Sequence, residues 1–240
     1  MGNNAPILIT GAAKRIGLFC AKKLHQQYPV IITYRTETPA IDTLRSAGII
    51  CLHADFSSQS GIQNFITQLK ETTTSLRAVI HNASSWLSED TVEDPAALMQ
   101  SMLQVHVHAP YQINLACADM LIAEQPAQCD IIHITDYMTE AGSPSHIAYA
   151  ASKAALENMA MSFAKKMAPQ VKVNAIAPSL ILFDEHASTA YQEKTLKKSV
   201  FGLEPGEVEI EQAIQFILKS KYMTGRVLRL EGGRHLPGER

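Results

Sequence analysis

The sequence predicts a doubly wound α/β fold, with a parallel sheet of about seven strands and helices on both faces. Short apolar runs rich in Ile and Val recur along the chain, and long amphipathic segments separate many of them. Right-handed crossovers in such βαβ units place ligands at the carboxyl ends of the strands. The expected strands are PILIT (6–10), PVIITY (29–34), IICLH (49–53), RAVIH (77–81), CDIIHIT (129–135), VKVNAIA (171–177) and RVLRL (226–230).

Two long helices are expected from their length, at 95–123 and 146–167. Patches of small residues such as AYAASKAAL would let these helices pack closely against each other or against another subunit. The segment 182–206 is the least strand-like region between elements, and we expect a mobile substrate loop there. Since no repeat or linker interrupts the chain, residues 1–240 are expected to form one domain.

Charge and composition disfavour several classes of protein. The 21 Lys and Arg residues nearly balance the 23 Asp and Glu residues, so no long-range field attracts nucleic acid or an anionic membrane, and a small ligand is expected. The sequence shows neither a signal-like N-terminus nor a stretch of about 20 apolar residues, which predicts a cytoplasmic protein. The cysteines form no C-x-x-C pair or metal-like group, so we expect structural thiols and no metal. They are Cys20, Cys51, Cys117 and Cys129.

A glycine-containing turn follows the first expected strand. In TGAAKRIG (10–17), backbone amides could approach a pyrophosphate at the start of a helix. Gly11 and Gly17 are present, but Arg15 replaces the middle small residue of the usual dinucleotide fingerprint. A plain glycine turn is the alternative interpretation, so this motif alone is a weak signal.

The ends of the second and third strands favour NADPH over NADH. Arg35 and Thr36 offer the cationic and hydroxyl donors that a ribose 2′-phosphate needs, whereas Glu37 comes late for a ribose hydroxyl. A solvated arginine at a strand end is the alternative. After the third strand, Asp55 and Phe56 stand where an adenine edge lies in such folds.

Tyr149 and Lys153 are four residues apart in an expected helix and therefore share a face. An ammonium group beside a phenol stabilises the phenolate and lowers its pKa, which makes the tyrosine a usable proton donor and acceptor. Such a pair could be a chance pairing on a helix surface. Its place after the fifth strand of a nucleotide-binding pattern favours the functional interpretation.

Here the sequence resembles the short-chain dehydrogenase/reductases over nearly the whole chain, through TGAAKRIG, ADFS, HNAS, the Tyr149–Lys153 pair, APS and TGRVLRLEGG. The resemblance implies a Rossmann-type domain whose tyrosine exchanges a proton with the substrate. It also implies a lysine that binds the nicotinamide ribose and tunes the tyrosine. The NADPH-binding residues it implies are Gly11, Lys14, Arg15, Ile16, Gly17, Arg35, Thr36, Asp55, Phe56, Asn82, Ala83, Ser84, Tyr149, Lys153, Pro178, Ser179 and Leu180.

Asp136 stands where this family usually has a serine, thirteen residues before the tyrosine. Together with TGAAKR and NASSW, it resembles the pteridine reductase branch. That resemblance implies a pterin pocket lined by Arg15, Ser84, Trp86 and Asp136 beside Tyr149, with Trp86 stacked on the pterin. The alternatives are a packing tryptophan and a turn-forming aspartate.

The carboxylate itself points to a nitrogen heterocycle. An ionised Asp136 would repel the oxyanion of a carbonyl substrate. It could instead accept from pterin N–H groups, or share a proton with Tyr149 if burial raises its pKa. His106 takes the place of a family asparagine that holds a water near the lysine. Histidine can hold water or relay a proton, and a satisfied interior histidine is the equal alternative.

The resemblance to the pteridine reductase branch extends through ILITGAAKRIG, YRTETPAIDTL, HIAYAASKAALENM and APSLILF, and it implies reduction of 7,8-dihydromonapterin with NADPH, dihydrofolate or dihydrobiopterin being a side activity. Family resemblance also implies a homotetramer packed through the long helices. The alternatives are a reductase of a carbonyl or sugar substrate and a non-catalytic NADP-binding sensor. The sequence does not separate monapterin, biopterin and folate side chains, because Lys194, Lys197 and Lys198 suit a solvated helix face as well as a folate tail.

Overall fold

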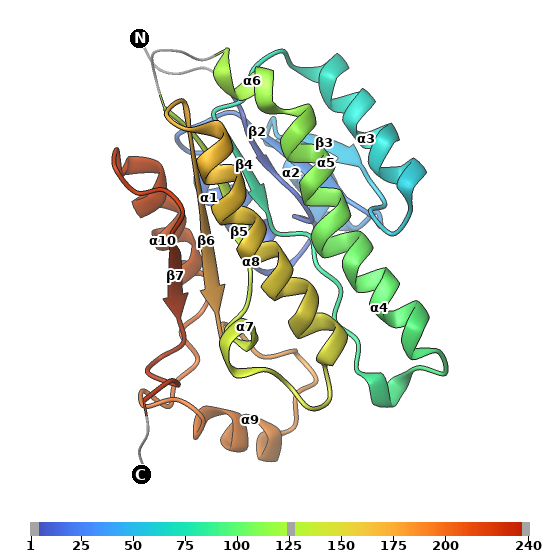
Figure 1. Cartoon of the computed structure of the whole chain (residues 1–240), viewed down its shortest axis with the longest axis vertical. Helices are drawn as coiled ribbons and strands as arrows, with labels where there is room; N and C mark the ends of the chain where they lie inside the picture. Colours follow the sequence, from blue (N-terminus) through green and yellow to red (C-terminus); the bar gives the residue numbers. More distant parts are fainter. Residues whose placement is uncertain (1–4, 124–127, 237–240) are drawn as a thin grey trace.

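Seven parallel strands form one sheet, in the order β3-β2-β1-β4-β5-β6-β7, in the computed structural model, which describes residues 5–123 and 128–236. Each strand lies where an apolar run predicts it, which confirms the doubly wound α/β class (Figure 1). The strands are β1 (Ile7–Ile9), β2 (Val30–Tyr34), β3 (Ile50–His53), β4 (Ala78–His81), β5 (Cys129–Ile134), β6 (Val171–Pro178) and β7 (Val227–Leu230).

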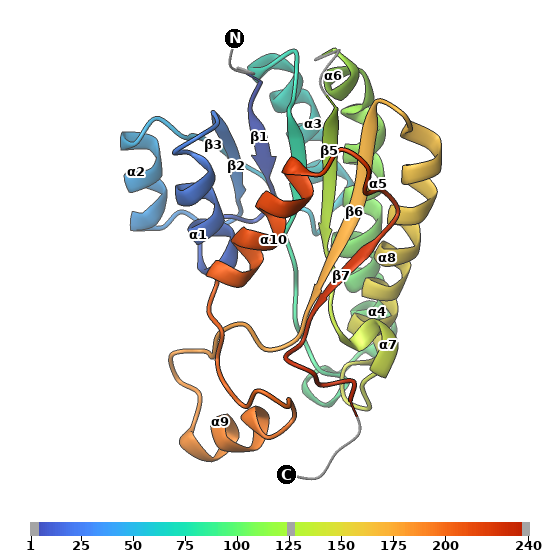
Figure 2. The ribbon, with the colours of Figure 1, turned by 90° about the vertical axis from the view of Figure 1, so that its left-hand side faces the viewer.

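Helices cover both faces of the sheet (Figure 2). Successive strand residues therefore enter two different cores: Leu8 packs with α3, α5 and α8, whereas Ile7 and Ile9 pack with α1, α2 and α10. Burial on both faces explains why these strands are continuous apolar runs rather than alternating ones. The helices are α1 (Arg15–Leu24), α2 (Pro39–Ser46), α3 (Gln59–Thr72), α4 (Pro95–Leu103), α5 (Ala109–Ala116), α8 (Ile147–Met167) and α10 (Val208–Lys219).

The helix expected over 95–123 is interrupted. A π-helical turn, η2 (Gln104–His108), joins α4 to α5, and a short α6 (Ala118–Ile122) follows. Pro110 accounts for the π-turn, because proline has no N–H to give to the carbonyl of His106 and its ring would clash there. The turn widens so that the Ala109 N–H bonds to Gln104 O, five residues back.

The second long helix agrees with its prediction, since α8 begins after His146 and ends at Met167. The segment 182–206 contains a helix that the sequence does not predict, α9 (Thr189–Leu196), N-capped by Ser188. This helix lies beyond the carboxyl ends of the strands (Figure 1). Two short elements flank the same edge, η1 (Glu89–Thr91) and α7 (Met138–Ala141).

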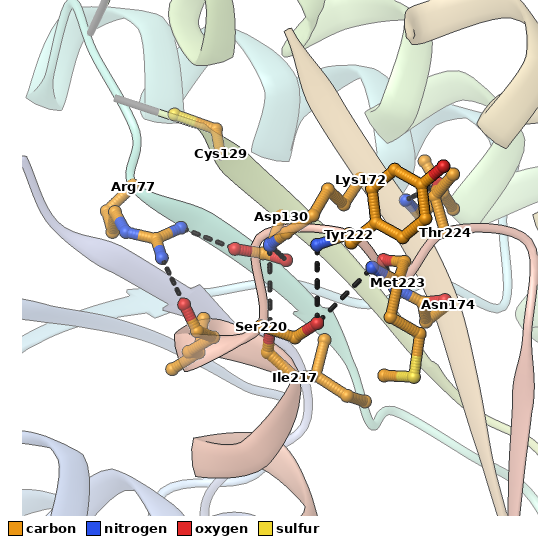
Figure 3. Close-up of polar contacts among 12 residues, drawn as sticks. Arg77, Cys129, Asp130, Lys172, Asn174, Ile217, Ser220, Tyr222, Met223 and Thr224 are labelled. Carbon is orange, nitrogen blue, oxygen red and sulfur yellow. Dashed lines mark hydrogen bonds and ion pairs between the residues drawn. The ribbon is translucent and has the colours of Figure 1, made fainter. Parts of the chain in front are cut away.

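At the opposite, amino-terminal edge of the sheet, three buried charges meet the end of α10 (Figure 3). Asp130 Oδ2 accepts from Arg77 Nη1 at 2.6 Å, and Asp130 Oδ1 accepts from Lys172 Nζ. The two cations also donate to the carbonyls of Leu218 and Ile217, which have no partner within the helix. Burial raises the pKa of Asp130 although both cations act against that shift.

No helix in the two described ranges is long and apolar enough to cross a bilayer. Cys20 and Cys117 are buried, and burial raises the pKa of each thiol to about 12. Such thiols are unreactive near neutral pH, in agreement with the structural role expected from the sequence.

Candidate active site

The turn after β1 is held against the loop after β4. Asn82 Nδ2 donates to the carbonyls of Thr10 and Gly11 at 3.1 and 2.9 Å. A Cβ on Gly11 would lie 2.6 Å from Ala83 Cα, and one on Gly17 would lie 2.6 Å from Asn82 Nδ2. Both glycines are thus required by close approach, and Gly11 also has a φ of 65°.

Arg15 occupies the position where the usual fingerprint has a small residue, and the backbone shows the consequence. Its φ is 52°, in the left-handed region that a residue with a side chain rarely adopts. The side chain crosses to segment 182–206, where Nη2 donates to Leu182 O at 3.1 Å and Nη1 lies 3.6 Å from Asp184 Oδ2. The strained turn therefore connects the glycine motif with segment 182–206.

A cavity of about 380 Å³ opens beside this turn, between the ends of β2 and β3. Arg35 and Thr36 line it, in the place where a 2′-phosphate would be bound. The Glu37 carboxylate is already paired, because Arg45 donates to both of its oxygens at 2.5 and 3.3 Å. The Arg45 guanidinium holds the pKa of Glu37 below its usual value. The other expected residues in this lining are Gly11, Lys14, Asp55, Phe56, Ala83 and Ser84.

A second cavity of about 330 Å³ lies at the carboxyl ends of β4, β5 and β6. Ser84 lines both cavities, so the two form successive parts of one groove. Most residues that the sequence assigns to the reaction meet here. They are Arg15, Ile16, Asn82, Ser84, Asp136, Tyr149, Lys153, Pro178, Ser179 and Leu180.

Asp136 faces Tyr149 inside this second cavity. The Tyr149 hydroxyl donates to Asp136 Oδ2 at 2.9 Å, while Oδ1 accepts from Met138 N–H at 2.9 Å. One oxygen thus forms the turn after β5, and the other reaches the tyrosine. Burial raises the pKa of Asp136, and burial followed by the Asp136 charge raises that of Tyr149 well above its ordinary value.

Lys153 is fully buried beneath the tyrosine. Its Nζ donates to Ile134 O at 2.8 Å and lies 5.7 Å from the Tyr149 ring centre. Burial lowers the pKa of Lys153 to about 8, and Asp136 opposes that shift. The expected lowering of the tyrosine pKa by this lysine does not occur in this arrangement, because burial and the neighbouring carboxylate prevail.

Trp86 is half exposed and lies outside both sets of lining residues, at the edge of the second cavity. One face of its indole stacks on His146, with ring centres 4.0 Å apart, and its ring meets Tyr149 edge-on at 4.5 Å. His146, the residue before α8, was not identified from the sequence. An aromatic side chain just before the tyrosine helix was the only available signal.

Other side chains contact residues of the site from outside the cavity, and they were not identified from the sequence. Ser152, buried on α8, bonds His106, which is itself buried behind Ser84. Arg234 donates to Ser179 Oγ at 2.8 Å and lies over the Tyr137 ring. None of these contacts follows from a local motif, since each joins elements far apart in the chain. The lysines of the α9 region, Lys194, Lys197 and Lys198, are exposed.

A doubly wound parallel sheet, with a glycine turn after β1 and a Tyr–Lys pair at the carboxyl edge, defines a nucleotide-dependent oxidoreductase. The sequence profile described as short chain dehydrogenase matches residues 5–194, and the chain belongs to that family.

Similar proteins agree with this assignment. A dihydromonapterin reductase of Klebsiella pneumoniae subsp. pneumoniae is 54% identical over 232 residues, covering 96% of this chain and 97% of that protein. A dihydromonapterin reductase of Escherichia coli O139:H28 is 49% identical over 239 residues, covering 98% of this chain and all of that one (100%).

Among solved structures, FolM alternative dihydrofolate reductase 1 from Brucella suis, in complex with NADP, is similar with a TM-score of 0.87. It is 25% identical and covers 100% of this chain and 98% of its own. The Pseudomonas aeruginosa RhlG/NADP complex shares the fold, with a TM-score of 0.87 at 22% identity, covering 97% of this chain and 96% of its own.

Proposed function

We propose that this protein reduces 7,8-dihydromonapterin to its tetrahydro form with NADPH, with dihydrofolate or dihydrobiopterin reduction as a side activity. The carboxylate of Asp136, which faces the Tyr149 hydroxyl inside the second cavity, carries this proposal. Relatives named dihydromonapterin reductase, which are 54% and 49% identical to this chain, also support the proposal.

NADPH fits the groove by its shape and charge. Gly11 and Gly17 leave room for backbone approach, and Arg35 and Thr36 offer donors for a 2′-phosphate once Arg45 has neutralised Glu37. Bound NADPH would supply a hydride from nicotinamide C4. Lys153 would hold the nicotinamide ribose, in addition to its bond with Ile134 O. The remaining positions that the family resemblance assigns to the cofactor line the same groove.

The chain's own residues manage the proton. Reduction of the C6=N5 double bond adds a hydride to C6 and a proton to N5, and the groups that could deliver that proton are Tyr149, Asp136 or a water between them. The raised pKa of each group keeps a proton on the pair near neutral pH. Arg15, Ser84 and Trp86 would position the pterin, with the half-exposed indole of Trp86 available for stacking.

A carbonyl substrate fits this cavity less well. Its reduction would build negative charge on an oxygen beside the Tyr149 hydroxyl, and the ionised form of Asp136 would repel that charge. A non-catalytic NADP sensor could use Lys153 to hold the cofactor, but it would have no use for a buried phenol paired with a carboxylate. The carbonyl alternative therefore leaves Asp136 without a purpose, and the sensor alternative leaves the pairing of Asp136 with Tyr149 without one.

We also propose a cytoplasmic homotetramer that packs through the long helices. Several large apolar side chains are exposed on these helices in the single chain, as expected of an interface. They are Tyr111 and Leu115 on α5 and Ile147 and Met161 on α8. Light scattering coupled to gel filtration should give four times the chain mass, and a monomer would exclude this assembly.

The test of function is NADPH oxidation with 7,8-dihydromonapterin, 7,8-dihydrobiopterin and dihydrofolate side by side. We expect turnover to be fastest with dihydromonapterin and to be strongly reduced in Asp136→Ser. A simple ketone and a sugar serve as comparison substrates. Turnover of those compounds without turnover of any dihydropterin would establish the carbonyl alternative, and cofactor binding without any turnover would favour the sensor.

A further inference from the structure

His106 is placed by the π-turn between α4 and α5, directly behind the substrate cavity. Its side chain is only 1% exposed, and its ring meets the Tyr149 ring edge-on with centres 5.4 Å apart. The side chain lies against the loop that follows β4, where it contacts Ser84 and Ser85. Buried polar side chains need partners, and both nitrogens of this imidazole have them.

The partners fix where the ring proton lies. His106 Nε2 accepts from the backbone N–H of Ser85 at 3.1 Å and lies 2.9 Å from Ser84 Oγ. An amide N–H can only donate, so Nε2 carries a lone pair and no proton. The proton of the neutral ring is therefore on Nδ1, which donates to Ser152 Oγ at 2.8 Å.

The same logic orients every hydroxyl in the chain of bonds. Ser152 Oγ donates to Tyr149 O at 2.7 Å, so its lone pair is free to accept from His106 Nδ1. At the other end, the Ser84 hydroxyl can bond Nε2 only by donating its proton. All donors thus point in one direction, from the loop after β4 through His106 to the backbone of α8.

A proton relay would need something different from His106. It would have to take a proton at one nitrogen and release it from the other, but the bonds beyond Nδ1 end at the backbone carbonyl of Tyr149, which cannot pass a proton on. Burial, followed by the charge of Lys153, also lowers the pKa of His106 to about 2. A charged imidazole would moreover direct an Nε2–H at the Ser85 N–H.

The orientation of Ser84 has a consequence for the ligand. While its proton is given to His106, its Oγ presents only lone pairs to the groove, so it can accept a hydrogen bond but cannot donate one. The bond from Ser84 that lowers the pKa of Tyr149 forms only when this proton turns away from His106. Ser84 lines both cavities, which places this acceptor where cofactor and substrate sites meet. A pterin carries N–H groups that would satisfy it, whereas a ketone oxygen would not.

We propose that His106 is a positioning residue, held neutral with its proton on Nδ1, that makes Ser84 a hydrogen-bond acceptor for an N–H group of the substrate. The assignment of that N–H to a pterin rests on the proposed function. The protonation state and orientation of His106 do not, and they can be tested without any substrate.

The first experiment is ¹⁵N NMR of histidine-labelled protein, with His106→Asn as the variant that identifies the His106 signals by their loss. We expect a protonated Nδ1 and an unprotonated Nε2 that do not titrate between about pH 5 and about pH 9. A proton on Nε2, or a titration midpoint inside that range, would overturn the proposal whatever the enzyme reduces.

The second experiment separates positioning from relay and from simple structural support. His106→Phe keeps a ring but removes both nitrogens, so Ser84 is no longer oriented. We expect KM for the dihydropterin to rise roughly tenfold, with kcat and the midpoints of its pH profile nearly unchanged. His106→Asn, whose amide can accept from Ser85 and donate to Ser152, should recover most of that loss.

Ser84→Ala provides the matched comparison. If His106 acts through Ser84, the two variants raise KM similarly, and the double variant is little worse than either single one. Additive losses, or a fall in kcat with a displaced pH profile and unchanged KM, would show that His106 does not act by orienting Ser84. A lower unfolding midpoint with unchanged KM would reduce His106 to a packing residue.

Discussion

The Tyr149 hydroxyl donates to Asp136 Oδ2 across 2.9 Å, which joins the proton donor of the family to a carboxyl group instead of a serine. A serine hydroxyl would stabilise a phenolate, whereas a carboxylate opposes one. The bond consequently keeps the phenol protonated, and burial adds to that effect. This pairing suits a reduction in which a ring nitrogen must receive a proton.

The first prediction concerns the charge of Asp136. Asp136→Asn retains an oxygen for the Met138 N–H, but it has no carboxylate and places an amide NH2, which can only donate, opposite the Tyr149 hydroxyl. We expect kcat with the dihydropterin to fall roughly 10²-fold, the lower end of a general acid–base contribution. The pKa of Tyr149 should also fall, since the Asp136 charge helps to raise it.

A pH profile of kcat measures this prediction. The alkaline limb should move to lower pH in Asp136→Asn, because the tyrosine loses a like-charged neighbour. In Asp136→Ser, the family's usual residue, dihydropterin reduction should stay low while reduction of simple ketones rises. Wild-type kcat in Asp136→Asn would contradict any role for the carboxylate in proton delivery.

Local sequence patterns were sufficient to predict the sheet and the second long helix. Each strand is a continuous Ile- and Val-rich run because both faces of the sheet are covered, so length and composition located it. The π-turn was not predicted, because the 3.6-residue period continues through 104–108. Pro110 was the available signal, since a proline inside a helix removes a bond to the residue four positions earlier.

Spacing predicted the partners in the active site better than their electrostatics. Tyr149 and Lys153 meet as their helical separation requires, but the pKa of the tyrosine depends on burial and on Asp136, which comes from another element. Long-range contacts such as those of His146 with Trp86 carry no sequence period at all. Sequence alone therefore placed the functional groups at one edge without determining their protonation.

The second prediction concerns cofactor preference. Arg45 holds the Glu37 carboxylate and also donates to Tyr34 at 2.8 Å, at the end of β2. In Arg45→Ala, the freed Glu37 charge would lie near a bound 2′-phosphate. We expect KM for NADPH to rise roughly three- to tenfold at low salt, with little change for NADH, because exposed charges are partly screened.

Glu37→Gln in the Arg45→Ala background should restore the NADPH preference, because it removes the repelling charge. Asp42→Asn is the control, since Asp42 contacts the same guanidinium from the solvent side at 3.1 Å. Steady-state kinetics with NADPH and with NADH gives the ratio of the two KM values directly. An unchanged NADPH-to-NADH ratio in Arg45→Ala would rule out this role for Arg45.

The third prediction is destabilisation in mild acid, which follows from three buried histidines. His81 Nε2 bonds Asn114 Oδ1 at 2.7 Å, and Asn114 Nδ2 lies 3.2 Å from His133 Nε2. Burial lowers the pKa of His81 to about 4 and that of His133 well below its ordinary value. With His106, these side chains stay neutral in the folded protein while their unfolded counterparts take up protons near pH 6.5.

Below that pH the unfolded state binds more protons, so the free energy of unfolding decreases as the pH falls. Urea titrations at about pH 7.5 and about pH 5.5 should give free energies of unfolding that differ by roughly 3–4 kcal/mol. Asp130 and Asp136 will reduce this difference. Those two carboxyls act oppositely, because their raised pKa values favour the protonated native state. In His81→Asn, the number of protons taken up on unfolding, read from the slope of the free energy of unfolding against pH, should fall by about one. Equal stability at both pH values would contradict neutral histidines.

The fourth prediction separates stability from activity. Asp130→Asn would leave Arg77 and Lys172 buried without a counter-charge at the amino-terminal edge of the sheet (Figure 3). Removing one partner of a buried pair costs about 3–5 kcal/mol, so the urea midpoint should fall strongly. The activity per folded molecule should stay at the wild-type level, because the second cavity, where we propose that the substrate binds, lies at the opposite, carboxyl ends of the strands.

Lys172→Met is the matched control for Asp130→Asn. It keeps the bonds between Arg77 and Asp130 and brings the cluster to neutrality, so its loss of stability should be clearly smaller, although the carbonyl of Ile217 loses a donor. Added salt should not rescue Asp130→Asn, since the affected charges are buried and poorly screened. If the two variants unfold at the same urea concentration, the unpaired cations are not the cause of the destabilisation. If Asp130→Asn instead loses kcat while still folded, the amino-terminal edge is coupled to the active site, and stability and activity are not separable at this position.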